Sequence, residues 1–327
     1  MKKPLQSTPL QIEISDIDLN SGQFCMSFNF NLGPLKASIE RYGILNPPYL
    51  LRNSDDSFRV VAGYRRLLAL RELCWSDTVC KILPDDFPPL EALLLNLHDN
   101  LVHRHLNSVE KGMVLHRLTR FLTKEEIVSN FMPILGIPSN RQALEQFLGL
   151  EELEETIRIS VATERLSPRV AGLMCSLGRD DRLRINDLFV SLRWSFSQQW
   201  EATLWIVEIA SREGRSIREV IENERVTEVL KNDKMNSPQK VRAIVRTLRE
   251  RRFPTLMESE RSFKRGVSDL ALPSRVRVIP PPFFEGADYK LEIVFREGKE
   301  LKEKVARLYR TAGLEEIADF WKTKNRV

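Results

Sequence analysis

Residues 60–69 read Val-Val-Ala-Gly-Tyr-Arg-Arg-Leu-Leu-Ala. An apolar run ends at Gly63, and Arg65 and Arg66 follow where a helix is expected to begin. A glycine lets a ligand approach the backbone closely because it has no Cβ. The first turn of a helix has unpaired N–H groups, and guanidinium groups match phosphate oxygens bidentately. The segment therefore predicts an anion site, although an ordinary solvated helix start gives the same pattern.

The flanking segments predict a small α/β arrangement around this turn. Residues 35–42 are expected to form an amphipathic helix, with Leu35, Ile39 and Tyr42 on one face and Gly43 as its C-terminal stop. Residues 44–51 are expected to be extended, and residues 53–57 to form a polar turn. Strands are expected at residues 58–62 and 78–83, on either side of the arginine-bearing helix.

Three sequence boxes in this order resemble the amino-terminal domain of ParB-type partition proteins, which has the ParB/sulfiredoxin fold. The family pattern is Ser-Ile-x-x-x-Gly-Ile/Leu-x-x-Pro, then Gly-x-Arg-Arg-x-x-Ala, then Glu-Asn-x-x-Arg-x-x-Leu-Asn-x-x-Glu. The matching residues here are Ser38, Ile39, Gly43, Ile44 and Pro47, then Gly63, Arg65, Arg66 and Ala69, then the run from Asp99 to Glu110. The resemblance covers approximately residues 8–225 and is sharpest over residues 35–110.

The resemblance implies a pocket that binds a nucleoside triphosphate, CTP in the best-known members, together with Mg²⁺. The residues implied for the nucleotide are Gly43, Ile44, Gly63, Arg65, Arg66, Asn100, His103 and Arg104, and those implied for the metal are Asp99 and Asn100. The chemistry agrees, because guanidinium groups neutralise phosphates, and carboxylate and amide oxygens suit Mg²⁺. In the alternative interpretation, Asp99 and Asn100 only belong to a helix, and the arginines pair with surface carboxylates.

Two positions depart from the family pattern. Tyr64 occupies the place of a glutamate implicated in nucleotide hydrolysis, and a phenol cannot act as a carboxylate base. Whether the chain is an enzyme is therefore left open, with weak CTP hydrolysis at most, and sulfiredoxin chemistry would need a cysteine at this place. His103 stands in the slot of the third-box arginine, and Arg104 follows one position later, about 100° further round a helix. Either residue can face the phosphates.

The chain has 327 residues, a formal net charge of +5 and a pI near 9.0. This length suffices for two or three domains, and a mildly basic balance permits nucleic-acid binding without requiring it. Without an apolar run of membrane-spanning length or a secretory signal, we expect a cytoplasmic, nucleoid-associated protein. The spacing of the four histidines and four cysteines includes no His-x-x-x-His or Cys-x-x-Cys pair, which argues against a zinc site.

Helix signals dominate after residue 110. Thr123 with Glu126, and Ser139 with Gln142, each form a capping box, and they predict two helices joined by a turn. The pair is a helix-turn-helix candidate at the position where the ParB family carries its DNA-reading motif. The side chains predicted to reach base edges in a major groove are Asn140, Arg141, Gln142 and Gln146. A helical hairpin used only for packing is the alternative.

The remainder of the chain is less distinctive. Trp194, Trp200 and Trp205 are expected to pack in a helical core rather than to stack on bases. A linker is expected near residues 231–238, and a basic helix at residues 240–252 either follows a phosphate backbone or is a solvated face. Strands are expected at residues 275–279 and 289–295, and a helix at residues 299–309 with Leu301, Val305 and Leu308 in one apolar stripe. This order resembles the ParB carboxy-terminal dimerisation unit.

The sequence thus predicts an α+β fold in three parts. Residues 8–98 form a ParB/sulfiredoxin-like nucleotide-binding domain, and residues 99–230 form a helical domain with the helix-turn-helix. Residues 231–327 supply the linker, the basic helix and a small C-terminal α/β unit for dimerisation.

The expected function is that of a ParB-like DNA-binding protein in plasmid or chromosome partition, with the nucleotide as a switch. The expected partners are double-stranded DNA, the nucleotide, a second copy of the chain and a ParA-type ATPase, with no membrane. Two alternatives stay open. A ParB-like transcriptional regulator of a mobile element would bind one local operator, and a ParB-fold nuclease or phosphotransferase would form products from nucleotides or DNA.

Overall fold

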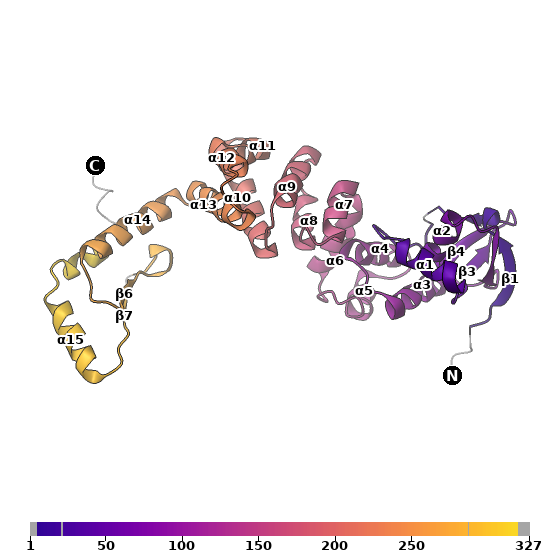
Figure 1. Cartoon of the computed structure of the whole chain (residues 1–327), viewed down its shortest axis with the longest axis horizontal. Helices are drawn as coiled ribbons and strands as arrows, with labels where there is room; N and C mark the ends of the chain where they lie inside the picture. Colours follow the sequence, from indigo (N-terminus) through magenta and orange to yellow (C-terminus); the bar gives the residue numbers. More distant parts are fainter. Residues whose placement is uncertain (1–4, 21, 287, 320–327) are drawn as a thin grey trace. The chain divides into compact units, whose positions relative to one another are not determined.

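The structure is a computed structural model that describes residues 5–20, 22–286 and 288–319 (Figure 1). The predicted α+β class is confirmed, because a mixed sheet in the N-terminal part is followed by helices and by a strand pair near the C-terminus. The chain forms two compact units, Met1–Thr203 and Leu204–Val327. Among the described residues, none of the helices combines the length and the apolar character needed to cross a membrane.

A five-stranded sheet forms the start of the first unit, in the order β1-β5-β3-β4-β2. Its strands are β1 (Thr8–Glu13), β2 (Ile17–Asp18), β3 (Tyr49–Arg52), β4 (Phe58–Ala62) and β5 (Asp77–Ile82). The pairs β1/β5 and β3/β4 are antiparallel, whereas β3/β5 and β2/β4 are parallel. The predicted strand at residues 58–62 is therefore confirmed, and the one predicted at 78–83 lies one residue earlier.

Both faces of the sheet are covered. The neighbouring residues Leu50 and Leu51 point to opposite faces, because side chains alternate along a strand, and each belongs to a different buried cluster. On one face Leu50 packs with residues of α1 (Gly33–Tyr42) and α2 (Tyr64–Glu72). On the other face Leu51 packs with residues of α3 (Pro89–His103) and of the helices that follow.

The first predicted helix is correct in extent but not in its apolar face. Gly43 ends α1 with a φ of 70°, as a C-terminal glycine is expected to do. Ile39 is buried, but Tyr42 is 60% exposed and lies under the guanidinium group of Arg41. Tyr42 is the last residue of α1 and does not belong to the buried cluster that contains Ile39.

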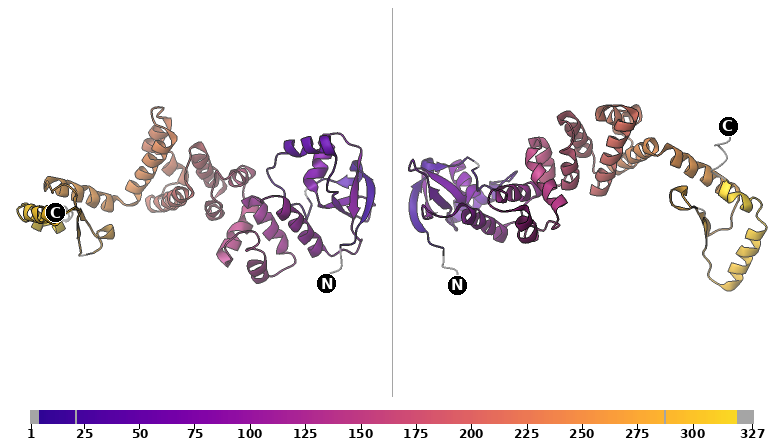
Figure 2. Two further views of the ribbon diagram at one scale, coloured as in Figure 1. Left: turned by 60° about the horizontal axis from the view of Figure 1, so that its bottom comes forward. Right: turned by 180° about the vertical axis from the view of Figure 1, so that it is seen from behind.

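Six further helices complete the first unit and lie next to the sheet or to one another (Figures 1 and 2). They are α4 (Ser108–Leu118), α5 (Lys124–Asn130), α6 (Arg141–Leu148), α7 (Glu155–Ala162), α8 (Pro168–Met174) and α9 (Arg179–Ser191). The capping box of Thr123 and Glu126 is confirmed. The next helix is capped by Asn140 and not by Ser139, because the Asn140 side chain accepts a hydrogen bond from the Ala143 N–H at 2.8 Å.

The compact units differ from the predicted domains. The predicted boundary at 98/99 falls inside α3, whose residues Leu93 and Leu97 share one buried cluster with Leu115 of α4. The sheet and the first helices after it therefore have a common core. The two units meet at residues 203/204, inside α10 (Phe196–Glu213).

The second unit begins with helices and ends with a strand pair and a helix. Its elements are α11 (Ile217–Ile221), α12 (Glu224–Lys231), α13 (Ser237–Arg252), α14 (Pro254–Asp269), β6 (Val276–Ile279), β7 (Lys290–Ile293) and α15 (Gly298–Tyr309). β6 and β7 are antiparallel, with Val276 opposite Ile293. The predicted order of strand, strand and helix is therefore present.

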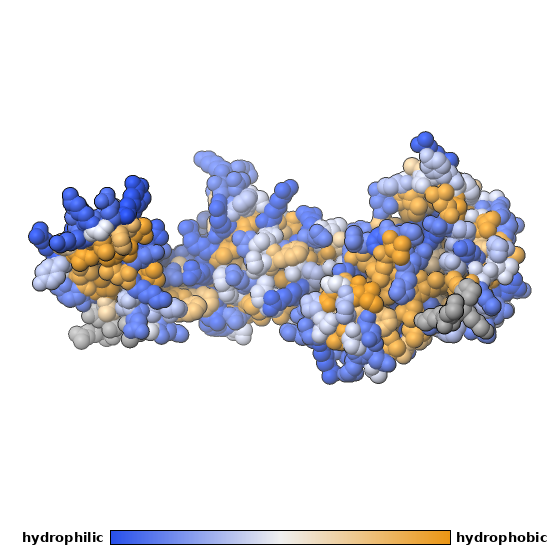
Figure 3. Space-filling view, turned by 90° about the horizontal axis from the view of Figure 1, so that it is seen from below, coloured by the Kyte–Doolittle hydropathy of each residue, from blue (hydrophilic) through white to orange (hydrophobic). Residues whose placement is uncertain are grey.

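The apolar stripe expected on α15 is only partly buried. Leu308 is buried, but Val305 is 48% exposed, and Lys304 is buried instead. The Lys304 ammonium donates to the Val294 carbonyl oxygen at 2.7 Å and lies 2.8 Å from a Glu300 carboxylate oxygen. Figure 3 shows apolar side chains at the surface of this unit, where Leu291 and Phe295 are also exposed.

Candidate anion-binding site

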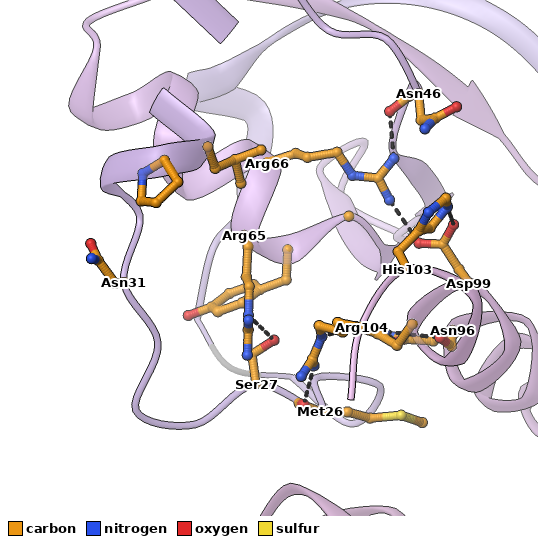
Figure 4. Close-up of a pocket in the computed structure, with 15 residues that line it drawn as sticks. Met26, Ser27, Asn31, Asn46, Arg65, Arg66, Asn96, Asp99, His103 and Arg104 are labelled. Carbon is orange, nitrogen blue, oxygen red and sulfur yellow. Dashed lines mark hydrogen bonds and ion pairs between the residues drawn. The ribbon is translucent and has the colours of Figure 1, made fainter. Parts of the chain in front are cut away.

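A cavity of about 360 Å³ lies in the first unit, between the start of α2, the end of α3 and residues 26–31. It lies within the range of about 300–1,000 Å³ that is usual for ligand pockets. The predicted site residues among its lining are Gly63, Arg65, Arg66, Asp99, Asn100, His103 and Arg104 (Figure 4). The fold thus brings the arginine pair after the glycine and the acid-amide pair of α3 into one cavity.

Gly63 positions the arginines. It precedes α2 with a φ of 97°, in the left-handed region that favours glycine. A Cβ at this position would lie 2.9 Å from the Pro48 Cβ, closer than side chains approach one another. The absence of a side chain therefore lets the start of α2 press against the segment before β3, and Arg65 and Arg66 enter the cavity from there.

Arg66 is held at both ends of its guanidinium group. Its Nη2 donates to an Asp99 carboxylate oxygen at 2.7 Å, and its Nη1 donates to the Asn46 carbonyl oxygen at 2.5 Å (Figure 4). His103 Nε2 lies 3.9 Å from the other Asp99 oxygen. Asp99 thus orients Arg66, and its negative charge offsets that of the guanidinium group. An anionic ligand therefore has to compete with Asp99 for Arg66.

Arg65 and Arg104 share one buried carboxylate, that of Glu110. Glu110 Oε1 lies 2.5 Å from Arg65 Nη2, and Glu110 Oε2 lies 2.6 Å from Arg104 Nη1. Burial lowers the pKa of Arg65, and the charge of Arg104 lowers it further, whereas Glu110 opposes both effects. Three guanidinium groups thus meet two carboxylates, which leaves the cluster with an excess of positive charge.

The sequence did not identify Glu110 as a site residue. Its only signal was its place at the end of the third box, three residues after Asn107, where it completes a capping box for α4. Asn96 was missed too: its Nδ2 donates to the Phe24 carbonyl oxygen at 2.8 Å and also to that of Val61. Residues 26–31 carry no motif, yet Arg104 Nη2 donates to the Met26 carbonyl oxygen at 2.9 Å.

Two residues predicted for the nucleotide do not line this cavity. Gly43 ends α1, and a Cβ there would meet no atom within 4 Å. Ile44 packs against the buried cluster under α1 and α2 and lines a different, more open cavity. Both belong to the first box in sequence, but neither is among the residues that line the cavity with the arginines.

The metal ligands predicted from the sequence are engaged with arginines. Asp99 pairs with Arg66, and the Asn100 Oδ1 accepts from Arg104 Nε at 2.7 Å. The described residues contain no group of three or more His, Cys, Asp or Glu side chains placed to hold a metal ion. One carboxylate and one amide fit Mg²⁺ where phosphate oxygens and waters supply the remaining ligands.

Tyr64 lies at the cavity wall. Its ring meets Phe30 edge to face, with centroids 6.4 Å apart, and the Arg65 guanidinium lies 4.5 Å from the Phe30 centroid. Burial is the main cause of the raised pKa of the Tyr64 phenol. The phenol therefore stays neutral near pH 7 and offers neither a base nor a metal ligand.

The four residues predicted to read DNA lie on or beside α6. Asn140, Arg141 and Gln142 are exposed. Gln146 is half-buried, because it packs against Gly172 of α8, where a Cβ would lie 3.0 Å from the Gln146 Cβ. The face that includes residues 140–142 is therefore more accessible than Gln146.

The arginines of α13 fall into two groups. Arg249, Arg251 and Arg252 form ion pairs with carboxylates of Glu260, Glu213 and Glu208. Arg242 and Arg246 are exposed and line a shallow groove together with Lys234. The arginines at the end of the predicted basic helix are thus paired with carboxylates, whereas Arg242 and Arg246 line the groove.

Residues 2–101 match the family model of the ParB N-terminal domain. This match covers the sheet, α1 and α2, and most of α3, and so all of the cavity lining except His103 and Arg104. Residues 2–101 are therefore similar to the ParB N-terminal domain, which confirms the predicted resemblance to ParB-type partition proteins.

Curated relatives agree with this assignment. A nucleoid occlusion protein of Lysinibacillus sphaericus is 22% identical over 189 residues, which are 56% of this chain and 60% of the relative. A second nucleoid occlusion protein, from Halalkalibacterium halodurans, is 26% identical over 151 residues, 46% of this chain and 50% of the relative. A probable plasmid-partitioning protein ParB of Thermus thermophilus is 39% identical over 101 residues, 30% of this chain and 33% of the relative. The chain thus matches at most about three fifths of the length of these relatives.

Solved structures with some similarity include two of the C-terminally truncated chromosome-partitioning protein ParB from Caulobacter crescentus. The one complexed with CTP-gamma-S has a TM-score of 0.26 at 19% identity, over 56% of this chain and 99% of that chain. The one complexed to the centromeric parS site has a TM-score of 0.31 at 18% identity, over 64% of this chain and 96% of that chain.

Proposed function

We propose that this chain is a ParB-like DNA-binding protein whose N-terminal cavity holds a nucleoside triphosphate with Mg²⁺ as a switch. The observation that carries the proposal is the convergence of Arg65, Arg66 and Arg104 in one cavity that also contains Asp99 and Asn100. An excess of guanidinium groups beside a helix start favours a polyphosphate over a neutral ligand. The resemblance of the domain to ParB makes CTP the first nucleotide to test.

In this proposal each residue has a distinct task. Arg65, Arg66 and Arg104 bind phosphate oxygens, and His103 adds a partly exposed imidazole at the rim. Asp99, with Asn100, holds Mg²⁺ once the phosphates take over its arginine partner. The metal supplies charge neutralisation between phosphate groups. Hydrolysis is not part of the proposal, because Tyr64 provides no carboxylate.

The proposed nucleic-acid interface is α6, preceded by α5. Asn140, Arg141 and Gln142 lie exposed at the start of α6, and side chains at this position of a recognition helix reach base edges. The relationship to a plasmid-partitioning protein supports a role in DNA partition or nucleoid occlusion. A second copy of the chain, bound through the C-terminal unit, and a ParA-type ATPase are further proposed partners.

The experiment that tests the proposal is a calorimetric titration of the full chain with CTP, UTP, ATP and GTP, each with Mg²⁺. We expect one triphosphate to bind, and Arg66→Ala to weaken it at least about tenfold, because a hydrogen bond to a charged group contributes about 1.5–3 kcal/mol. Arg71→Ala is the matched control: Arg71 is exposed in the last turn of the same helix and does not line the cavity. The proposal fails if no triphosphate binds, or if Arg66→Ala binds as tightly as Arg71→Ala.

A further inference from the structure

Glu110 has the surroundings of a bound phosphate group rather than those of an ordinary surface carboxylate. Only 1% of its side chain is exposed, whereas Arg65 and Arg104 are 25% and 18% exposed. Its oxygens accept from both arginines, from the Phe28 N–H at 3.1 Å and from the Asn107 N–H at 3.0 Å. The donors are two guanidinium groups and two backbone N–H groups, and one of these N–H groups, that of Asn107, lies at the start of α4. Proteins use donors of these kinds for phosphate oxygens.

Glu110 lies behind the arginines and does not line the cavity. Each guanidinium group therefore has one side toward the cavity and one side toward Glu110. All three nitrogens of Arg104 already donate, to Asn100, Glu110 and Met26, and Arg65 donates to Ser27 and Glu110. Figure 4 shows the bonds from Arg65 to Ser27 and from Arg104 to Met26. Each guanidinium group has five N–H donors, so N–H groups remain for a polyphosphate, but the polyphosphate has to share the positive charge of these two arginines with Glu110.

We propose that Glu110 is an internal counter-ion that competes with the bound polyphosphate for Arg65 and Arg104, and thereby sets the affinity of the cavity. The inference rests on the proposed function, since it assigns a residue that regulates the same site. Without ligand, Glu110 stabilises two half-buried positive charges that would otherwise repel each other. With ligand, its negative charge repels the phosphates. Glu110 therefore lowers the affinity for the ligand while it stabilises the ligand-free protein.

The helix that carries Glu110 is also in contact with α6. Glu110 belongs to the first turn of α4, and two residues later Gly112 contacts α6. A Cβ at Gly112 would lie 2.6 Å from the Phe147 carbonyl oxygen, so the two helix backbones touch there without an intervening side chain. A change in the hydrogen bonds of Glu110 therefore acts on the helix that packs directly against the proposed DNA-binding element.

The test compares Glu110→Gln with the wild-type chain and with Glu126→Gln, using inorganic triphosphate as the probe at constant ionic strength. Glutamine keeps the size and the capping geometry but removes the charge. Glu126 is the matched control, because it occupies the same capping-box position on α5 but is paired with Thr123 and lies outside the cavity. We expect Glu110→Gln to bind triphosphate about tenfold more tightly, since a charge-assisted hydrogen bond to each arginine is weakened.

Thermal unfolding without ligand is measured alongside. Glu110→Gln is expected to unfold at a lower temperature than Glu126→Gln, and added triphosphate is expected to raise its midpoint by more than that of the wild type. If Glu110 only capped α4, Glu110→Gln and Glu126→Gln would bind triphosphate with the same affinity. Equal or weaker binding by Glu110→Gln overturns the inference, while binding of CTP by the wild type would leave the proposed function standing. Absence of inorganic triphosphate binding by all three proteins overturns the inference, and absence of CTP binding as well overturns the proposed function.

A second pair of variants serves if Glu110→Gln does not fold. Arg104→Gln and the double variant Arg104→Gln/Glu110→Gln differ only in the carboxylate, and in the double variant a neutral pair replaces the buried Arg104–Glu110 ion pair. The double variant is expected to bind triphosphate more tightly than Arg104→Gln alone, because Arg65 no longer has a competing anion. Equal or weaker binding by the double variant would refute the role of Glu110.

Discussion

Gly63 is the residue on which the geometry of the cavity depends most. Its φ of 97° and the 2.9 Å approach of a Cβ to Pro48 are two separate obstacles to any other residue. Gly43 shares the first obstacle, with a φ of 70°, but not the second, because nothing lies within 4 Å of its Cβ position. The two glycines lie in the same domain and form a natural pair for comparison.

We predict that Gly63→Ala weakens triphosphate binding and destabilises the domain, whereas Gly43→Ala affects stability only. Backbone strain lowers the free energy of unfolding of each variant by about 1–3 kcal/mol. The loss is larger for Gly63→Ala, because its Cβ also collides with Pro48. Chemical denaturation gives the stability of each variant, and calorimetry with CTP and Mg²⁺ gives the affinity. Equal affinities of the two variants would show that the approach of α2 to Pro48 does not position the arginines.

The residues of the site were predictable where the sequence signal is local. The arginine pair follows its glycine directly, and Asp99 and Asn100 are adjacent, so the boxes mark them. Glu110 was missed as a site residue because its role depends on partners far away in sequence, such as Phe28, 82 positions earlier. Gly43 and Ile44 were assigned to the cavity from their box, but the direction of the chain after α1 is a tertiary property that the box does not encode.

At the scale of elements, α6 shows how a capping residue constrains a proposed recognition helix. Asn140 accepts a hydrogen bond from the Ala143 N–H, so its side chain already serves the helix start. A side chain committed in this way is less free to read a base than those of Arg141 and Gln142. Ser139, the cap expected from the sequence, precedes the actual cap by one residue.

We predict that Asn140→Ala destabilises the first unit by about 1 kcal/mol, the usual cost of losing a cap, and that Ser139→Ala does not. Asn140→Ser should restore the stability, because serine also caps helices. Binding of the three variants to duplex DNA, measured by fluorescence anisotropy, separates capping from base reading. Loss of DNA affinity in the stable Asn140→Ser variant would show that Asn140 contacts DNA, whereas equal stability of Asn140→Ala and Ser139→Ala would contradict the cap.

Elements with strong local signals were predicted well. The strand at residues 58–62 and the capping box that begins at Thr123 are both present. The apolar faces of α1 and α15 were predicted less well, because burial depends on which part of a helix faces a neighbour. Lys304 can be buried on α15 because the Val294 carbonyl oxygen and the Glu300 carboxylate both contact its ammonium group.

At the scale of the whole molecule, the hydrophobic core explains why the predicted first boundary does not coincide with a compact unit. The predicted boundary lies after residue 98, but α3 continues to His103 and packs on β4 and on α4. One buried cluster thus joins the sheet and α3 to α4, α5 and α6. This shared core supplies a physical route for coupling between the cavity and α6, as a switch requires.

We expect nucleotide binding in the cavity and DNA binding to be coupled. The most direct measurement is the CTP affinity of the full chain, with Mg²⁺, in the absence and presence of a duplex selected by the chain from a random pool. We predict that the duplex changes the CTP dissociation constant by at least about fivefold, and that CTP changes the DNA affinity by the same factor, because coupling between sites is reciprocal. An identical CTP affinity with and without the duplex would contradict the account.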